Sequence, residues 1–272
     1  MITDTHTHFV LREFDLLEGL PPRTASASFD AAEKAIGILG KYGIGRAWAC
    51  TLEGLVDDTA PYNRFLCRLA RRYPVRVAPF CTVNPHLGER AVQEFREMVL
   101  KRGMKGLKLH NWLQAVSNMS RWVERLVDEA GRMGVPVLFH DGTPPYATPL
   151  QIARLAGKFP HTTVVLGHSG LQDLYPDAIR AAKQHANIYL CACSASHEGL
   201  KRMVDRVGPG RILFGTDGGF GDFSGLVELH LDLVDSLGLG AEDREKILWK
   251  NAHTIVPDPH TAGPGEGGKT EP

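Results

Sequence analysis

The segment ITDTHTHF, residues 2–9, is the most informative stretch of the chain for its fold. It begins as a short β-strand, expected over residues 2–5, and continues directly into Thr-His-Thr-His. An open, doubly wound α/β sheet usually places a glycine-rich phosphate-binding turn after its first strand. Because histidines occupy that place here, a closed barrel is favoured and the open sheet is the alternative.

Seven more short runs rich in Val, Ile, Leu and Phe follow, separated by longer amphipathic segments. We expect strands over residues 46–50, 75–83, 106–110, 136–139, 163–167, 188–193 and 212–215. In one intervening segment, residues 121–133, apolar side chains recur at three- and four-residue steps, as a helix with one buried face requires. This alternation, within the ~250 residues typical of the fold, predicts a (β/α)8 TIM barrel in a single domain, residues 1–256. Residues 257–272 are dense in proline, glycine and charge, which predicts a disordered tail.

The composition of the 272 residues is that of a globular protein: 43% are hydrophobic, and 31 Lys and Arg balance 31 Asp and Glu. A net charge of zero argues against nucleic acid as the main partner, since phosphate binding needs a basic excess. No apolar run approaches the roughly 18–20 residues that span a bilayer, and the N-terminus lacks a signal-peptide pattern. We therefore expect a cytoplasmic protein that acts on a small molecule and binds no membrane. Whether it forms a homo-oligomer stays open.

The five cysteines include no C-x-x-C pair, which is typical of buried thiols in a reducing compartment. Cys191 and Cys193 lie two residues apart in an expected strand and therefore share one face of it. A soft-metal pair is conceivable at this spacing. We interpret both as small side chains of the core.

Polar side chains gather at the carboxyl ends of the expected strands. They are His6 and His8 on the first strand, His110, His140 and His168 on the fourth, fifth and sixth, and Asp217 on the eighth. A barrel brings the carboxyl ends of all its strands to one rim, where such enzymes place their active sites. Imidazole nitrogens and carboxylate oxygens are the ligands expected of a catalytic divalent ion such as Zn²⁺. The sequence therefore predicts a metal site at this rim.

Simpler structural roles compete with this interpretation. His6 and His8, two apart and facing the barrel interior, could form a hydrogen-bonded core pair, but adjacent buried imidazoles without a charge partner are costly. Asp217 lies in Thr-Asp-Gly-Gly, a good turn sequence, and His168 could simply precede a helix. Turn chemistry does not account for the coincidence of these positions, so metal binding is favoured. Asp4, on the inner face of the first strand, is a candidate for orienting a ligand.

At these positions the sequence resembles the amidohydrolase superfamily, in particular the amidohydrolase-2 group, which also includes metal-dependent non-oxidative decarboxylases. The matching pieces are DTHTH (4–8), GLKLH (106–110), PVLFHDG (136–142), VVLGHSG (164–170), ILFGTDG (212–218) and ILWKNAHTIV (247–256). The resemblance implies that His6, His8, His140 and Asp217 bind a single divalent ion, with Zn²⁺ expected and Mn²⁺ as the alternative. It also implies that His168 is a catalytic or substrate-polarising residue beside the ion.

The fourth strand adds a lysine and a histidine on one face. In other branches of the superfamily, an inward lysine here is carbamylated and bridges two ions. The Lys108-Leu-His110 arrangement looks more like the group with one ion, so Lys108 is interpreted as a structural or electrostatic support. His110 and Trp112 are the expected substrate contacts, although Trp112 could equally pack against a loop at the rim.

The first functional hypothesis is a metal-dependent hydrolase that uses a metal-activated water on a small amide, lactone or ester. Asp217 would serve as the base and His168 would polarise the substrate. The alternative on the same site is a non-oxidative decarboxylase of an aromatic or unsaturated carboxylic acid. A TatD-like nuclease is disfavoured. Resemblance to that group would imply an acidic residue on the fourth strand, where this chain has Lys108 and His110. A non-catalytic barrel that binds a metal or metabolite is the remaining alternative.

Overall fold

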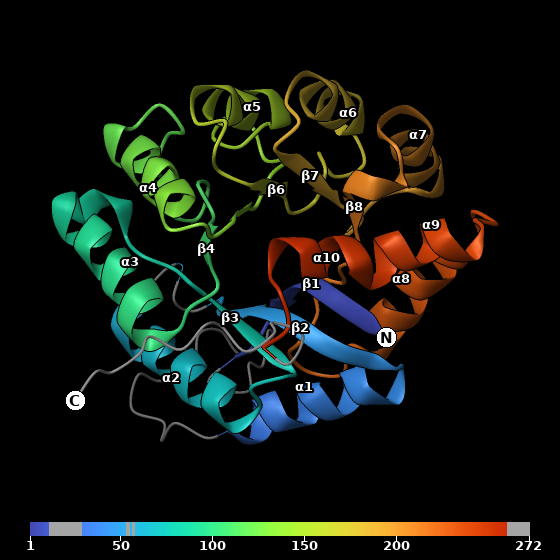
Figure 1. Ribbon diagram of the computed structural model, residues 1–272, viewed down its shortest axis with the longest axis horizontal. Coiled ribbons are helices and arrows are strands. Elements are labelled where there is room, and N and C mark those ends of the chain that lie inside the picture. The colour runs from blue at the N-terminus through green and yellow to red at the C-terminus, as the bar shows by residue number, and fades with distance from the viewer. Residues whose placement is uncertain (11–28, 53–54, 56–57, 260–272) are drawn as a thin grey trace, which may run out of the picture.

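The computed structural model describes residues 1–10, 29–52, 55 and 58–259. Eight parallel strands form one sheet whose spatial order follows the sequence (Figure 1). They are β1 (Ile2–His8), β2 (Ile44–Cys50), β3 (Val77–Cys81), β4 (Gly106–Leu109), β5 (Val137–Phe139), β6 (Val164–Leu166), β7 (Ile188–Cys191) and β8 (Ile212–Leu213). Each expected strand is present, and most are shorter at their ends than expected.

Most of the helices alternate with the strands and form the outer layer of the molecule (Figure 1). They are α1 (Asp30–Lys41), α2 (Thr59–Arg72), α3 (Glu89–Arg102), α4 (Arg121–Arg132), α5 (Pro149–Lys158), α6 (Tyr175–Gln184), α7 (His197–Val207), α8 (Ser224–Asp235), α9 (Ala241–Glu245) and α10 (Asn251–Ile255). Local chemistry sets several of their starts. In α5, for example, Thr148 and Gln151 form a reciprocal capping box, with proline in the first turn.

The sheet closes where β1 meets the chain that follows β8. The Thr5 amide donates to the Phe214 carbonyl at 2.9 Å, the Asp217 amide to the His6 carbonyl at 2.8 Å, and the His8 amide to the Gly218 carbonyl at 2.7 Å. Eight parallel strands closed in this way and surrounded by helices are a (β/α)8 TIM barrel, as the sequence predicts.

The core has two parts. Inside the barrel, Trp48 stacks on Phe80 with ring centroids 4.9 Å apart, and Leu138, Val165 and Leu213 pack in the same cluster. A larger apolar layer separates the outer face of the sheet from the helices. Because both faces of the strands are buried, several strands, such as β5, β6 and β8, are continuous apolar runs, whereas β1 (ITDTHTH) is mostly polar.

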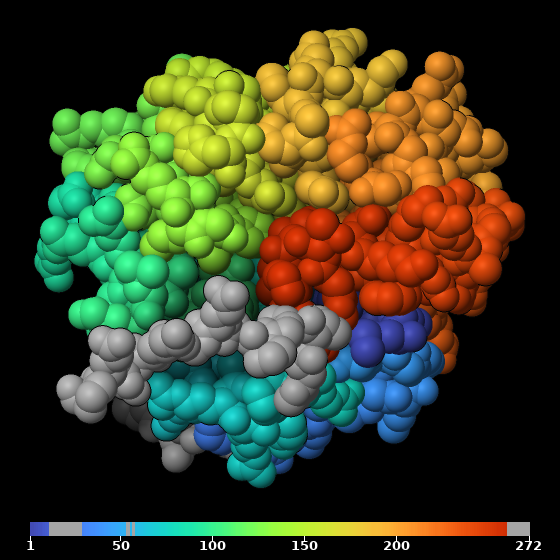
Figure 2. Space-filling model, viewed as in Figure 1, coloured from blue at the N-terminus to red at the C-terminus, as the bar shows by residue number. Residues whose placement is uncertain are grey.

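The segment after α9 closes the amino-terminal end of the barrel. The Asn251 amide group donates to the carbonyls of Pro209 and Ile212 at 2.8 Å, and the Arg46 guanidinium donates to the Val256 carbonyl at 2.8 Å. In the ribbon and space-filling views, α10 lies across the middle of the ring (Figures 1 and 2). The carboxyl ends of the strands are therefore at the opposite end of the barrel.

Most of the predicted C-terminal tail, residues 260–272, lies outside the described residues. Within the described part of the chain, none of the helices is both long enough and apolar enough to cross a bilayer.

Candidate metal centre at the carboxyl ends of the strands

His6 and His8 point from β1 into the barrel and are almost fully buried. Their Nε2 atoms lie 3.2 Å apart. The Nδ1 atom of His6 lies 3.0 Å from the carbonyl oxygen of Gly167, and Nδ1 of His8 lies 3.4 Å from the Cys50 sulfur. With the ring proton on Nδ1 in each case, both Nε2 lone pairs face the same small space, which is how metal-binding imidazoles are commonly oriented.

Asp217 brings a carboxylate to these two nitrogens. Its Oδ1 atom lies 3.0 Å from Nε2 of His8 and 3.4 Å from Nε2 of His6. The backbone of Asp217 has a φ of 60°, in the left-handed region that aspartate tolerates better than most residues. The backbone amide of the same residue donates a hydrogen bond to the His6 carbonyl, so Asp217 takes part in the closure of the sheet. The side chain remains 37% exposed, so a molecule from solvent can reach it.

Asp4 supports the site through the backbone. It is fully buried and accepts hydrogen bonds from the His6 amide at 3.1 Å, the Thr216 amide at 3.1 Å and the Thr216 hydroxyl at 2.6 Å. It thereby joins β1 to the segment that carries Asp217. Burial raises the pKa of Asp4 to about 7, against the effect of these hydrogen bonds.

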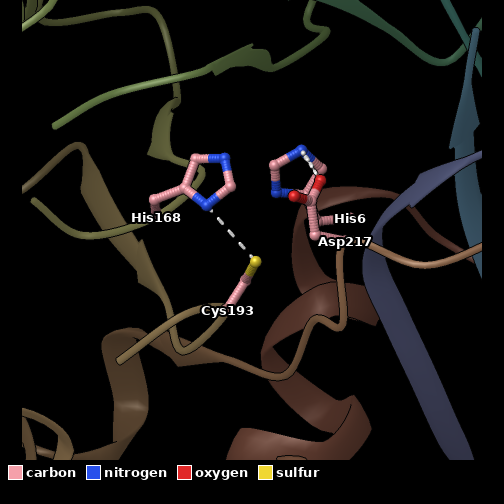
Figure 3. Close-up of side chains that lie close together, drawn as sticks. All are labelled: His6, His168, Cys193 and Asp217. Atoms are coloured by element: carbon pink, nitrogen blue, oxygen red, sulfur yellow. Dashed lines mark hydrogen bonds and ion pairs between the residues drawn. The ribbon is translucent and has the colours of Figure 1, made fainter. Parts of the chain in front are cut away.

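His168, after β6, completes a compact group with His6 and Asp217 (Figure 3). One potential ligand atom from each of these residues and from Cys193 lies within 4.8 Å of the others. The Cys193 sulfur is 3.4 Å from Nδ1 of His168. Cys193 therefore belongs to the site, and its interpretation as an ordinary core residue is incomplete. Cys191 lies among the apolar side chains of the barrel interior, as expected.

His140 and His110 form the adjoining part of the site. Nδ1 of His140 lies 2.8 Å from Nε2 of His168. The His110 and His140 rings stack with centroids 3.7 Å apart and an interplanar angle of 11°. His140 thus meets the group around Asp217 by way of His168. Trp112 is 51% exposed, close in sequence to His110 at the start of the loop after β4.

Burial and neighbouring charge keep most of these imidazoles neutral. Burial, reinforced by Lys108, lowers the pKa of His6 well below its usual value, and the pKa of His110 to about 3. Burial also lowers the pKa of His168 to about 3 and holds that of His140 far below normal. A neutral imidazole is the form that binds a metal.

Asp217 and His8 each favour the charged form of the other, whereas burial opposes both charged forms. Burial favours the protonated carboxyl of Asp217, but His6 and His8 outweigh it and hold the pKa of Asp217 far below its usual value. Burial likewise disfavours the charged form of His8, whereas the Cys50 sulfur and the Asp217 carboxylate raise its pKa to about 9. A divalent cation could replace the proton on His8 as the countercharge of Asp217.

The donor set fits a divalent ion of the zinc or manganese type. Two imidazole nitrogens and a carboxylate oxygen converge within 3.4 Å of one another, and mixed nitrogen and oxygen ligands suit such ions. Lys108 is fully buried, and its Nζ atom is 2.7 Å from Nε2 of His6. A positive charge thus already lies against this nitrogen. Lys108 was expected to be a structural or electrostatic support, and the group that it contacts is the His6 ring.

Two further residues hold the loops of the site, and the sequence reasoning missed them. Asp141 is fully buried and accepts hydrogen bonds from the amides of His168 at 2.7 Å and Gly170 at 2.6 Å. Nε2 of His230 accepts a hydrogen bond from the Ser194 amide at 3.1 Å, next to Cys193. Asp141 follows His140 in sequence, and this adjacency was the available signal. His230, on α8, offered none.

Comparisons with known proteins agree with this architecture. A family model described as Amidohydrolase, of the amidohydrolase-2 type, matches residues 3–257. No match to the chain is found among curated protein sequences.

Three similar solved structures illustrate the shared fold. A protein from Staphylococcus aureus, provisionally described as an amidohydrolase, is 16% identical, with a TM-score of 0.72 over 94% of this chain and 99% of that one. A dihydroxybenzoic acid decarboxylase from Polaromonas with bound manganese is 16% identical, with a TM-score of 0.68 over 93% and 96%. A 5-carboxyvanillate decarboxylase from Sphingomonas paucimobilis is 12% identical, with a TM-score of 0.70 over 94% and 99%.

Proposed function

Because the chain belongs to the amidohydrolase superfamily, we propose that it is a metal-dependent, non-oxidative decarboxylase of a small aromatic carboxylic acid. The observation that carries the proposal is the placement of the His6, His8 and Asp217 group beside the stacked rings of His110 and His140. Flat imidazole faces next to a cation site suit a flat ring that bears a carboxylate. The decarboxylases among the similar structures support this choice of reaction.

We assign the ion to His6, His8, His140 and Asp217. The manganese in the Polaromonas decarboxylase makes Mn²⁺ as reasonable a choice as Zn²⁺. When bound, the ion would act as a Lewis acid that attracts and orients the carboxylate of the substrate. Nζ of Lys108, now 2.7 Å from Nε2 of His6, has to withdraw from that nitrogen to make room. Lys108 then remains inside the site as a second positive charge for a substrate oxygen.

In the proposed reaction the bond between the ring carbon and the carboxylate breaks, and CO₂ leaves. The electron pair stays on the ring carbon, which takes up one proton, so that an aromatic carboxylate and a proton give the arene and CO₂. Asp217 is ionised, so the proton has to come from solvent, and we propose that the partly exposed Asp217 carboxylate relays it from water to the ring carbon. His168, fixed through its amide by Asp141 and near Cys193 at Nδ1, would hydrogen-bond a substrate oxygen.

The test is product analysis in D₂O. Protein loaded with Mn²⁺ or Zn²⁺ would be incubated with dihydroxybenzoates and 5-carboxyvanillate, the substrates named for the similar decarboxylases. We expect CO₂ and an arene with one deuterium at the carbon that carried the carboxylate. Asp217→Asn should lose this activity, whereas His197→Ala, at an exposed position on α7, should retain it.

Metal content separates the ligand assignment from the choice of reaction. His140→Ala should lose the ion while His197→Ala keeps it. If His168→Ala rather than His140→Ala lost the ion, the ligand set would be wrong. A hydrolase is the second candidate, favoured by the description of the matching family. Cleavage of an amide, lactone or ester with oxygen taken up from water, and no CO₂ release from any carboxylic acid, would replace the decarboxylase proposal.

A further inference from the structure

A recess of about 420 Å³ lies between α2 and α3, in the outer helical layer. Four arginines line it: Arg64, Arg68, Arg71 and Arg102. Its remaining lining is largely apolar and includes Cys67 and Met98. Among the described residues, no carboxylate contributes to the lining. The recess thus combines four positive charges with an apolar floor.

Three of the arginines share one side of α2. Arg64, Arg68 and Arg71 are separated by steps of four and three residues, which places them next to one another along the helix. Within the described part of the chain, none of the three has an ion pair; Arg68 contacts the Phe29 ring at 5.4 Å. Arg102 is the exception, at 3.4 Å from Glu97. Like charges at this spacing destabilise a helix, and among the described residues no carboxylate offsets the charges of these three arginines.

The groove between α6 and α7 provides the contrast. It is larger, at about 730 Å³, and it also has several basic side chains in its lining. There, however, Arg180, Lys201 and Arg202 each lie within 3.7 Å of a carboxylate on the same helix. Three basic residues of the α6–α7 groove are therefore paired with carboxylates, whereas within the described part of the chain Arg64, Arg68 and Arg71 of the α2–α3 recess are not.

We propose that the α2–α3 recess binds a small organic anion that carries two phosphate groups. A planar guanidinium donates two parallel hydrogen bonds to a phosphate, which makes arginine the preferred residue for this group. Two phosphate monoesters carry a charge of about −3 to −4 near neutral pH, which is similar in size to the positive charge of the three arginines that lack an ion pair among the described residues. The volume lies within the roughly 300–1,000 Å³ of small-molecule sites, and the apolar floor would contact the carbon skeleton.

The test is calorimetric titration of the metal-loaded protein with fructose 1,6-bisphosphate at low salt. The test variant is Arg64→Gln/Arg71→Gln, which leaves the contact of Arg68 with Phe29 intact. The matched control is Lys183→Gln/Arg206→Gln, which removes the same charge from the α6–α7 groove. We expect one site per chain and roughly hundredfold weaker binding in the test variant, because two charge-assisted contacts are lost. The control variant should bind as the unmodified protein does.

Three outcomes would overturn the proposal. They are the absence of binding at about 1 mM ligand, an equal loss in both variants, and tighter binding of a single-stranded oligonucleotide with the same dependence on Arg64 and Arg71. A thermal unfolding scan of the unmodified protein and both variants checks that each of them is folded. Without ligand, the test variant should unfold at the same or a higher temperature, because repulsion between like charges on α2 is removed.

Discussion

Gly167 lies directly behind the candidate metal centre, and replacing it with alanine tests how tightly the site is built. A Cβ atom at this position would be 2.5 Å from the Phe139 carbonyl oxygen and 3.1 Å from Cε1 of His6. The carbonyl of Gly167 also accepts the hydrogen bond from Nδ1 of His6. The substitution therefore forces β6 away from β5 and disturbs the orientation of His6.

The cost follows from these distances. Cβ contacts below 3.0 Å are essentially never seen, so the contact with the Phe139 carbonyl has to lengthen by at least half an ångström. Overpacking of this kind costs about 1–3 kcal/mol, and weakening the His6 hydrogen bond adds about 0.5–1.5 kcal/mol. We expect Gly167→Ala to lower the free energy of unfolding by about 2–4 kcal/mol. Misorientation of His6 should weaken metal binding roughly 10- to 100-fold.

Urea unfolding and metal titration of the same samples measure both effects. Gly37→Ala is the matched control, because it lies in α1, is exposed and has no atom within 4 Å of the added methyl group. It should raise the free energy of unfolding by about 0.5–1 kcal/mol, since alanine favours the helix. If Gly167→Ala were as stable as the unmodified protein and bound metal equally well, the packing around His6 would be looser than the distances imply.

Two other substitutions examine supports of the site, and a third examines the closure of the amino-terminal end of the barrel. Burial raises the pKa of Asp4 from 3.8 to about 7, so the folded state holds its proton more tightly, and this contribution to stability is lost as pH rises from about 4 to about 7. Asp4→Asn should remove a pH dependence of about 4 kcal/mol from urea unfolding curves; pH profiles parallel to those of the unmodified protein would contradict this. Cys50→Ala removes the sulfur beside Nδ1 of His8 and should weaken metal affinity about tenfold in a competition titration, and unchanged affinity would show that the sulfur does not orient the ring. Arg46→Met leaves the carbonyls of Val256 and Pro257 without their donor and should lower the free energy of unfolding by about 2–3 kcal/mol, whereas a loss below about 0.5 kcal/mol would mean that water replaces the guanidinium.

The barrel could be predicted from the sequence because its signals are local. Strands and helices follow from apolar runs and from amphipathic periodicity, and the order of alternation specifies the architecture. Helix α6 shows the limit of this reasoning. The helical segment of the sequence can be read from residue 171, but the helix begins at Tyr175, because residues 171–174 form a turn in which Leu171 has a φ of 56°.

The outline of the site was also readable from strand ends, since His6, His8 and Asp217 belong to strands whose carboxyl ends share one rim. Their distances were not readable. The pairing of β1 with β2 is irregular between Asp4 and Thr7, and such irregularities redirect side chains. The convergence of His8 and Asp217 at 3.0 Å therefore depends on how β1 and the segment after β8 pair across the closure.

The sequence alone thus specified the barrel and the kinds of side chain at its rim, because both follow from periodicity and from the position of a residue along its strand. Folding in three dimensions specified the supports: Cys50 beside His8, Cys193 beside His168, and Asp4 bonded to Thr216. These contacts join residues that lie far apart in the sequence, on different strands or in the segments that follow them. Their geometry depends on the packing of the whole closed sheet, which no local pattern records.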